Sequence, residues 1–313
     1  MTNNTNSDFS VRHFLAPINP FLLLDGVTEV AINQPKQVWV LINEQWECRD
    51  CPDLTEKHID TLCLTLSVFA SRPFSEENPI LSALLPDGER VQCVRDPVTP
   101  SGLFSVTIRK PSNTLLSLDY FERHGAFDHV DYGCADFRQW ILDGKTIVIA
   151  GETGSGKSTF AKALMDCIPQ SKRLITIEDT HELFSNHPNQ VNLTYPSEAK
   201  YGDPVTAATL LRSCLRMNPD RILLGELRGA ETFDFVNVVS SGHGGSFTTL
   251  HASSCELAFT RMALMMMQNP MAQTMSFEFA GQLCRDVVDV VIHIANTEDK
   301  GRHIDEVMIV GKM

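Results

Sequence analysis

The chain has 313 residues, of which 43% are hydrophobic and 21% are charged, and its formal net charge is −13. This composition is typical of a soluble globular protein, and the length favours two domains or one large domain with an extension. The chain is acidic both before and after Lys110, which argues against a module that attracts nucleic acid or anionic lipid by bulk charge.

The N-terminus and the cysteines indicate the compartment. The first ten residues are polar and lack the charged-then-apolar order of a signal peptide, and no apolar run approaches the roughly 18 residues of a membrane span. Nine scattered cysteines favour reduced thiols in a cytoplasmic protein. Cys48 and Cys51 form one CxxC, but no second pair follows, and Cys63 falls on an apolar helical stripe. A structural zinc site is therefore the weaker interpretation.

Residues 1–110 predict an N-terminal α+β domain. A helix is predicted over residues 54–70, where apolar residues recur at helical spacing. Short strands are predicted over residues 28–33, 38–42, 90–95 and 103–110. Residues 111–140 predict a linker with short helices, and we place the domain boundary there.

Residues 141–313 predict a second domain, because strands and helices alternate there as in a parallel sheet covered by helices. Asp203 and Pro204 are expected to begin one helix as N-cap and first helical residue, and Ser253 to Glu256 to form a capping box before another. Residues 287–295 and 304–310 predict a terminal hairpin. The other strands are predicted over residues 146–150, 174–177, 222–224 and 246–250, and the helices over residues 205–217 and 230–240.

The segment GETGSGKS, residues 151–158, matches the phosphate-binding pattern GxxxxGK[ST] between a predicted strand and a predicted helix. Its glycines let backbone N–H groups turn toward phosphate oxygens, and the helix N-terminus adds partial positive charge. Lys157 is expected to reach the β and γ phosphates, and Ser158 to hold Mg²⁺. The sequence therefore predicts a site for a nucleoside triphosphate, ATP with Mg²⁺. The predicted binding residues are Gly151, Glu152, Thr153, Gly154, Ser155, Gly156, Lys157, Ser158 and Thr159.

Carboxylates follow two other predicted core strands. Glu178, Asp179 and Glu182 follow the first, and Glu226 follows the second. In a parallel sheet the C-terminal strand ends lie beside the phosphates, so a carboxylate there can orient or deprotonate an attacking water. Glu226 can also contact magnesium or position the nucleophile. Both Glu178 and Glu182 stay candidates for the base, with a slight preference for Glu182, and a solvated acidic loop is the alternative.

Further side chains near these strands can respond to the nucleotide. His243 and His251 bracket the predicted strand 246–250, and His251 is expected to report the γ phosphate by hydrogen bonding. Arg228 can either contact that phosphate or form a plain salt bridge. Arg212 and Arg216 are weaker candidates, expected on one helix face at i and i+4.

Taken together, GETGSGKST, IEDTHEL, NPDRILLGELRGAE and SGHGGSFTTLHA resemble the four boxes of the secretion-ATPase superfamily. The resemblance is closest to the hexameric ATPases of type IV secretion and conjugation, the VirB-eleven-like family. VTEVAIN, ILSALLPDGERVQCV and FSVTIRKPS extend it into the N-terminal part, so it covers the chain from about residue 20. It implies a RecA-like P-loop domain with a smaller N-terminal domain, and nucleotide bound between them. It also implies that Arg90 and Arg109 match N-domain arginines that reach the phosphates.

The same resemblance implies an ATP hydrolase that powers substrate transfer or pilus biogenesis by a type IV secretion system. It implies a homohexamer on the cytoplasmic face of the inner membrane, held there by secretion-channel components. Direct sequence-specific binding of nucleic acid is not expected. The alternatives are a pilus-assembly or type II secretion motor, a DNA-translocating RecA-like ATPase, and a nucleotide switch without turnover.

Overall fold

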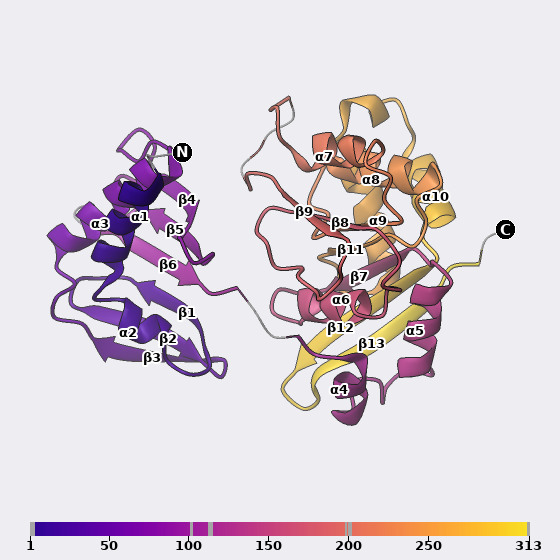
Figure 1. The fold of residues 1–313 in the computed structure, drawn as a ribbon, viewed down its shortest axis with the longest axis horizontal. Helices are drawn as coiled ribbons and strands as arrows, with labels where there is room; N and C mark the ends of the chain where they lie inside the picture. Colours follow the sequence, from indigo (N-terminus) through magenta and orange to yellow (C-terminus); the bar gives the residue numbers. More distant parts are fainter. Residues whose placement is uncertain (1–3, 101–102, 112–114, 198, 200–201, 312–313) are drawn as a thin grey trace. The chain divides into compact units, whose positions relative to one another are not determined.

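The structure is a computed structural model that describes residues 4–100, 103–111, 115–197, 199 and 202–311. It divides into two compact units, Met1–Ser112 and Asn113–Met313 (Figure 1). Residues 112–114, in the predicted linker, lie outside the described residues. Within the described ranges, no helix has both the length and the apolar character needed to cross a bilayer.

The first unit is built on an antiparallel sheet of six strands in the order β3-β2-β1-β6-β5-β4. Burial alternates along its central strands, as at Val38 and Val40 of β2 and at Val106 and Ile108 of β6. This period of two is expected where only one face of a sheet is covered. The strands are β1 (Val27–Ile32), β2 (Gln37–Ile42), β3 (Gln45–Asp50), β4 (Ile80–Leu84), β5 (Arg90–Val94) and β6 (Ser105–Arg109).

Three helices complete the first unit: α1 (Asn4–Leu15), α2 (Asn19–Leu22) and α3 (Glu56–Ala70). The α3 helix starts at Thr55, whose side chain accepts the N–H of His58. Its buried residues share one core with α1 and the covered face of the sheet, which confirms the predicted apolar stripe. They are Ile59, Leu62, Cys63 and Leu66.

The second unit contains a sheet of seven strands in the order β13-β12-β7-β11-β10-β8-β9. Every neighbouring pair is parallel except β12 and β13, which form the predicted hairpin. The strands are β7 (Ile147–Gly151), β8 (Leu174–Glu178), β9 (Gln190–Thr194), β10 (Arg221–Leu224), β11 (Phe247–Leu250), β12 (Val290–Thr297) and β13 (Gly301–Ile309).

Helices cover both faces of this sheet (Figure 1). Val148 and Ala150 of β7 pack in the core formed with α7 to α10, whereas Ile147 and Ile149 pack in the core formed with α4 to α6. This three-layer arrangement confirms the predicted α/β fold with a parallel sheet. The helices are α4 (Leu118–Arg123), α5 (Cys134–Leu142), α6 (Lys157–Met165), α7 (Ala207–Cys214), α8 (Glu231–Ser240), α9 (Cys255–Met266) and α10 (Phe277–Val287), with a short 3₁₀ helix at Pro270–Ala272.

Two predicted helix starts are wrong. The N-cap of α7 is Thr206, whose hydroxyl accepts the N–H of Thr209, and Asp203 and Pro204 lie before the helix. The N-cap of α9 is Ser254, which accepts the N–H of Leu257, so the helix begins one residue later than predicted and Leu257 replaces the glutamate that a capping box requires. In both cases more than one residue of capping type precedes the helix, and only the backbone turn selects one of them.

Candidate active site

The predicted site residues of the second unit gather where the parallel strands end. β7 leads into the glycine loop and α6, β10 into Gly225 and Glu226, and β11 into His251. β11 lies between β7 and β10, and β8 lies on the other side of β10. Since all four strands are parallel, their C-terminal ends share one edge of the sheet, where ligands of open α/β sheets bind.

The phosphate-binding loop approaches the sheet too closely for larger residues. A Cβ on Gly151 would lie 2.4 Å from the carbonyl oxygen of Ile294, and Gly156 has a φ of 100° at the N-cap of α6. Ser155 is buried, and its hydroxyl has no hydrogen-bond partner within the described ranges. A buried hydroxyl without a partner is costly, so the loop is suited to a polar ligand.

Lys157 is held at the centre of this edge. Its side chain is buried, and Nζ donates to the carbonyl oxygens of Gly151 (2.8 Å) and Glu152 (2.7 Å). Nζ also lies 3.3 Å from Nδ1 of His251. An ammonium group only donates, so Nδ1 accepts, and the proton of a neutral His251 is on Nε2. That Nε2 atom lies 2.9 Å from Oε1 of Glu226.

Glu226 continues this chain of contacts toward β8. Its Oε2 accepts from Nε of Arg228 (2.7 Å), and Nη1 of Arg228 donates to Oδ2 of Asp179 (2.6 Å). Burial opposes the charge of Arg228, but the two carboxylates outweigh it and raise the pKa of the guanidinium. Arg228 was expected either to contact the γ phosphate or to form a salt bridge, and in this structure it forms salt bridges with Glu226 and Asp179. The polar chain thus joins Lys157 to residues that follow three other strands.

The two candidate bases differ in their surroundings. Glu178 is buried, and its Oε1 accepts the backbone N–H groups of Glu182 (3.0 Å) and Leu183 (2.8 Å). Burial raises the pKa of Glu178, against these hydrogen bonds and nearby His181. Glu182 is half-buried on the loop that Glu178 holds. Glu178 therefore holds the loop through these hydrogen bonds, whereas Glu182 is one of the residues of that loop.

Sequence reasoning missed Lys162, which is fully buried on α6. Its ammonium lies 4.9 Å from the ring centre of Phe184, and burial lowers its pKa while the charges of Glu182 and Glu178 oppose that shift. A lysine within a helix is usually exposed. Only its position five residues after Lys157, one and a half turns along the same helix, could have signalled that it stays near the site.

Several predicted residues lie elsewhere. His243 precedes β11, at the edge opposite His251. Arg212 donates to Asp234 (2.6 Å), and Arg216 follows the end of α7, so the predicted shared helix face is wrong. In the first unit, Arg90 and Arg109 are Cα partners on neighbouring strands.

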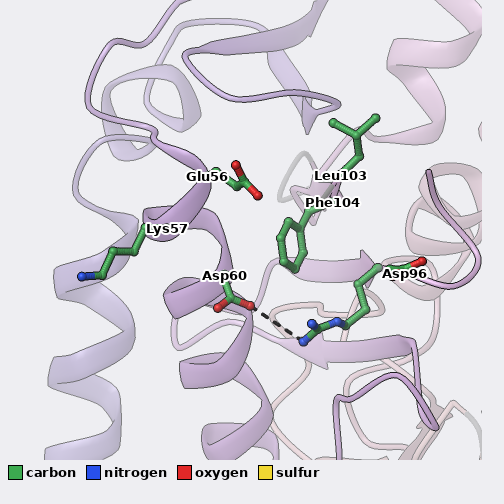
Figure 2. A pocket seen from close by; sticks show the side chains of 7 residues that line it. Glu56, Lys57, Asp60, Asp96, Leu103 and Phe104 are labelled. Atoms are coloured by element: carbon green, nitrogen blue, oxygen red, sulfur yellow. Dashed lines mark ion pairs between the residues drawn. The ribbon is translucent and has the colours of Figure 1, made fainter. Parts of the chain in front are cut away.

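A pocket of about 420 Å³ in the first unit contains none of the predicted site residues (Figure 2). Arg95 lies within it, 5.5 Å from the ring centres of Phe74 and Phe104 and 3.8 Å from Asp60. Arg95 and Asp60 form an ion pair in it, and we assign the pocket no ligand. The lining residues are Glu56, Lys57, Asp60, Arg95, Asp96, Leu103 and Phe104.

Comparison with known proteins finds secretion-system relatives along almost the whole chain. A family model described as "Type II/IV secretion system protein" matches residues 16–307. The type IV secretion system protein VirB11 of Brucella abortus biovar 1 (strain 9-941) is 48% identical over 323 residues, covering 95% of this chain and 89% of that protein. The type IV secretion system protein PtlH of Bordetella pertussis (strain Tohama I) is 36% identical over 320 residues, covering 93% and 92%.

A solved structure agrees. The crystal structure of the VirB11 ATPase from the Brucella suis type IV secretion system, in complex with sulphate, is 45% identical, with a TM-score of 0.54. The similarity covers 98% of this chain and 96% of that one. The resemblance seen in the four sequence boxes is therefore confirmed, and this chain belongs to the Type II/IV secretion system protein family as a secretion ATPase.

Proposed function

We propose that this ATPase powers substrate transfer or pilus biogenesis by a type IV secretion system. The observation that carries the proposal is the polar chain from Lys157 through His251 to Glu226, because it links the phosphate-binding loop to the ends of two other strands. The relatives reported above are type IV secretion proteins that match this chain over almost their full length. This favours type IV secretion over a pilus motor of the same family.

In the proposed ATP complex, Lys157 leaves the carbonyl groups of Gly151 and Glu152 and binds the β and γ phosphates. Residues 151–159 surround the phosphates. His251 then loses Lys157 as a donor to Nδ1 and can turn toward the γ phosphate. The orientation of His251 therefore depends on whether the γ phosphate is present, and a change in that orientation alters its contact with Glu226 after β10.

Ser158 and Glu226 would hold Mg²⁺ in this site. Their oxygen donors suit a hard cation. Oε1 of Glu226 is buried and, within the described ranges, has no hydrogen-bond partner, since His251 lies close but outside hydrogen-bond geometry. An oxygen left in this way fits a metal or a metal-bound water. When bound, the ion supplies charge neutralisation on the phosphates.

For the base we propose Glu182, which orients or deprotonates the attacking water. Glu178 already accepts two backbone N–H groups, and moving it would leave both without an acceptor. Glu178 therefore positions Glu182, and Arg228 positions Glu226 and Asp179. These roles divide the carboxylates of the site into those that react and those that hold the loops.

The assembly that we propose is a homohexameric ring on the cytoplasmic face of the inner membrane, attached through secretion-channel components. Arg90 and Arg109 would reach the phosphates from the N-terminal domain, residues 1–110. Two arginines directly opposite one another in a sheet repel unless an anion or a carboxylate lies near them. Glu29 is the Cα partner of Arg109 on its other side, so Arg109 lies between an arginine and a carboxylate in the sheet.

The chemical part of the proposal is tested at Lys157. Lys157→Ala should remove steady-state ATP hydrolysis and leave the thermal unfolding midpoint nearly unchanged, since Nζ donates to two carbonyl oxygens of the loop that water can reach once the side chain is removed. Lys172→Ala is the matched control, because Lys172 pairs with Asp220 away from the loop. A Lys157→Ala protein that still hydrolyses ATP at the parental rate would refute the assigned site.

The assembly part is tested separately, by particle size with and without a non-hydrolysable ATP analogue. Ring formation that depends on nucleotide, with turnover rising cooperatively as rings assemble, supports the motor. A single-subunit particle under both conditions would contradict it. Co-purification with conjugation-channel proteins supports type IV secretion, whereas co-purification with pilus platform proteins would favour the pilus motor.

A further inference from the structure

We infer that Arg302, on the C-terminal hairpin, is a positioning residue of the nucleotide site that holds the phosphate-binding loop and sets the affinity for the nucleotide's phosphates. The inference rests on the proposed ATP site. It concerns a residue outside the four sequence boxes and outside residues 151–159. The observation behind it is the contact that Arg302 makes with the loop across 148 positions of sequence.

The sheet brings the hairpin to the loop. β12 is the parallel neighbour of β7 on the side away from β11, with Ile294 opposite Gly151. The turn between β12 and β13 therefore follows the C-terminal end of another parallel strand, at the same edge as the loop, Glu226 and His251. Arg302, the second residue of β13, pairs with Asn296 just beyond this point.

The contact itself lies on the outer side of the loop. Nε of Arg302 donates to the carbonyl oxygen of Gly154 at 3.3 Å. Cδ of the same side chain would lie 3.4 Å from a Cβ at Gly156. The side chain thus runs along two glycines of the loop, and any larger residue at Gly156 would meet it.

Arg302 is exposed, but its backbone is fixed by its neighbours. The next two residues, His303 and Ile304, are buried. The N–H of Ile304 donates to the carbonyl oxygen of Ala126 at 2.7 Å, and Ile304 belongs to the core that contains α6. Since residues two apart in a strand face the same way, Arg302 points to the side of the sheet on which the loop continues into α6.

Two physical effects follow from this placement. The carbonyl of Gly154 and the N–H of Ser155 belong to one peptide group, so a hydrogen bond to that oxygen polarises the group. It strengthens the N–H of Ser155, which donates to the carbonyl oxygen of Glu152 at 3.3 Å in this structure, as a donor to a bound phosphate. The guanidinium also places a positive charge beside the loop that phosphates occupy. Both effects favour bound di- and triphosphate in the ground state and the transition state alike.

A contact of that kind changes binding more than turnover. In Arg302→Ala, the Kd for ADP and the KM for ATP should each rise about 5–30-fold, with kcat within about twofold. Arg302→Lys should recover part of the affinity, because it restores the charge without the guanidinium geometry. The difference in ADP affinity between parent and Arg302→Ala should shrink at high salt, since salt screens exposed charges. The effect on AMP should be smaller than that on ADP.

The matched control is Lys300→Ala, which removes the same charge from the turn of the same hairpin. It should leave the affinity for ADP unchanged. Calorimetry with ADP on the full chain, steady-state ATPase assays and thermal unfolding measure all three variants. The inference is overturned if Arg302→Ala binds ADP as the parent does, if kcat falls while KM stays constant, or if Lys300→Ala weakens ADP binding equally.

The same measurements separate this inference from the proposed function. If Lys157→Ala loses hydrolysis while Arg302→Ala keeps parental affinity, the proposed function stands and only the role of Arg302 is wrong. If the parental chain neither binds ADP nor hydrolyses ATP, the proposed function fails, and the role of Arg302 fails with it.

Discussion

The ends of β8 and β10 make an instructive comparison. Both strands are buried and parallel, lie side by side, and are followed by carboxylates at the same edge of the sheet. After β8, Glu178 is buried and bonds two backbone N–H groups of its own loop. After β10, Glu226 faces the side chains of His251 and Arg228 and keeps one oxygen without a hydrogen bond in the described part of the chain.

The difference shows that the position of a carboxylate at a strand end does not decide its role. Glu178 has its hydrogen-bonding capacity taken by the backbone, so its removal should affect folding. Glu226 contacts only groups that belong to the site, so its removal should affect chemistry. The two residues can therefore be separated by measuring turnover and the free energy of unfolding on the same variants.

Glu226→Gln should give the largest effect. The substitution keeps the size of the side chain but removes the charge that faces Lys157 through His251 and that would hold Mg²⁺. We expect ATP turnover to fall about 100-fold or more, with a small change in the free energy of unfolding. Glu256→Gln, at an exposed position of α9 that pairs with Arg285, is the control. Turnover within about fivefold of the parent would contradict the assigned role.

Glu178→Ala tests whether the carboxylate at the end of β8 stabilises the fold. It leaves the N–H groups of Glu182 and Leu183 without their acceptor in a buried position. The free energy of unfolding should fall by about 1–3 kcal/mol per uncompensated group, an upper range because water can replace the carboxylate. Glu178→Gln keeps an acceptor oxygen and should lose much less. Denaturant unfolding of both variants provides the measurement, and equal losses would show that the hydrogen bonds to the loop are unimportant.

His251→Ala should give a moderate loss. It breaks the chain between Lys157 and Glu226 without removing either, so turnover should fall about tenfold while ATP binding persists. His243→Ala is the control from the same sequence box, because His243 lies at the opposite edge of β11. Steady-state ATPase assays on both variants measure this difference in turnover. Equal losses would mean that the box acts through the stability of β11.

Much of this site could be predicted from sequence, because parallel strands bring their C-terminal ends to one edge whatever their separation along the chain. The loop at residues 151–158, Glu226 and His251 were placed together on that ground. The partners of Arg228 could not be predicted from sequence, because a long side chain has many rotamers and only the packed site selects one of them. Arg302 was missed because it follows a strand of the hairpin, and no motif marks it.

The strands and helices of the fold could also be predicted only in part. Most strands with continuous apolar residues were predicted, and so was the buried stripe of α3. The exposed edge strand β3 was not predicted, because all of its residues are exposed and its pairing with β2 comes from the backbone. The strands β4 and β9 and the helices α1, α2 and α10 were also missed. The caps were assigned to Asp203 and Ser253 in place of Thr206 and Ser254, because more than one capping residue precedes each helix.

The smallest effect concerns pH, and it again separates two carboxylates. Burial raises the pKa of Glu178 in the folded chain, whereas an unfolded glutamate titrates at about 4.3. The folded state therefore holds its proton more tightly, so the stability that this proton confers is full below the unfolded pKa and is lost as the pH rises through the folded pKa. Asp220 has the opposite sign, because the N–H of Arg173 and the charge of Lys172 lower its pKa.

Glu178→Gln cannot ionise, so its free energy of unfolding relative to the parent should increase as the pH rises from about 4.3 toward neutral. Asp220→Asn should behave in the opposite way. Its deficit relative to the parent should be complete above the unfolded pKa of about 3.9 and shrink as the pH falls below it. Urea unfolding at a series of pH values measures both differences on the same chain. Slopes of the same sign would mean that burial does not control the ionisation of Glu178.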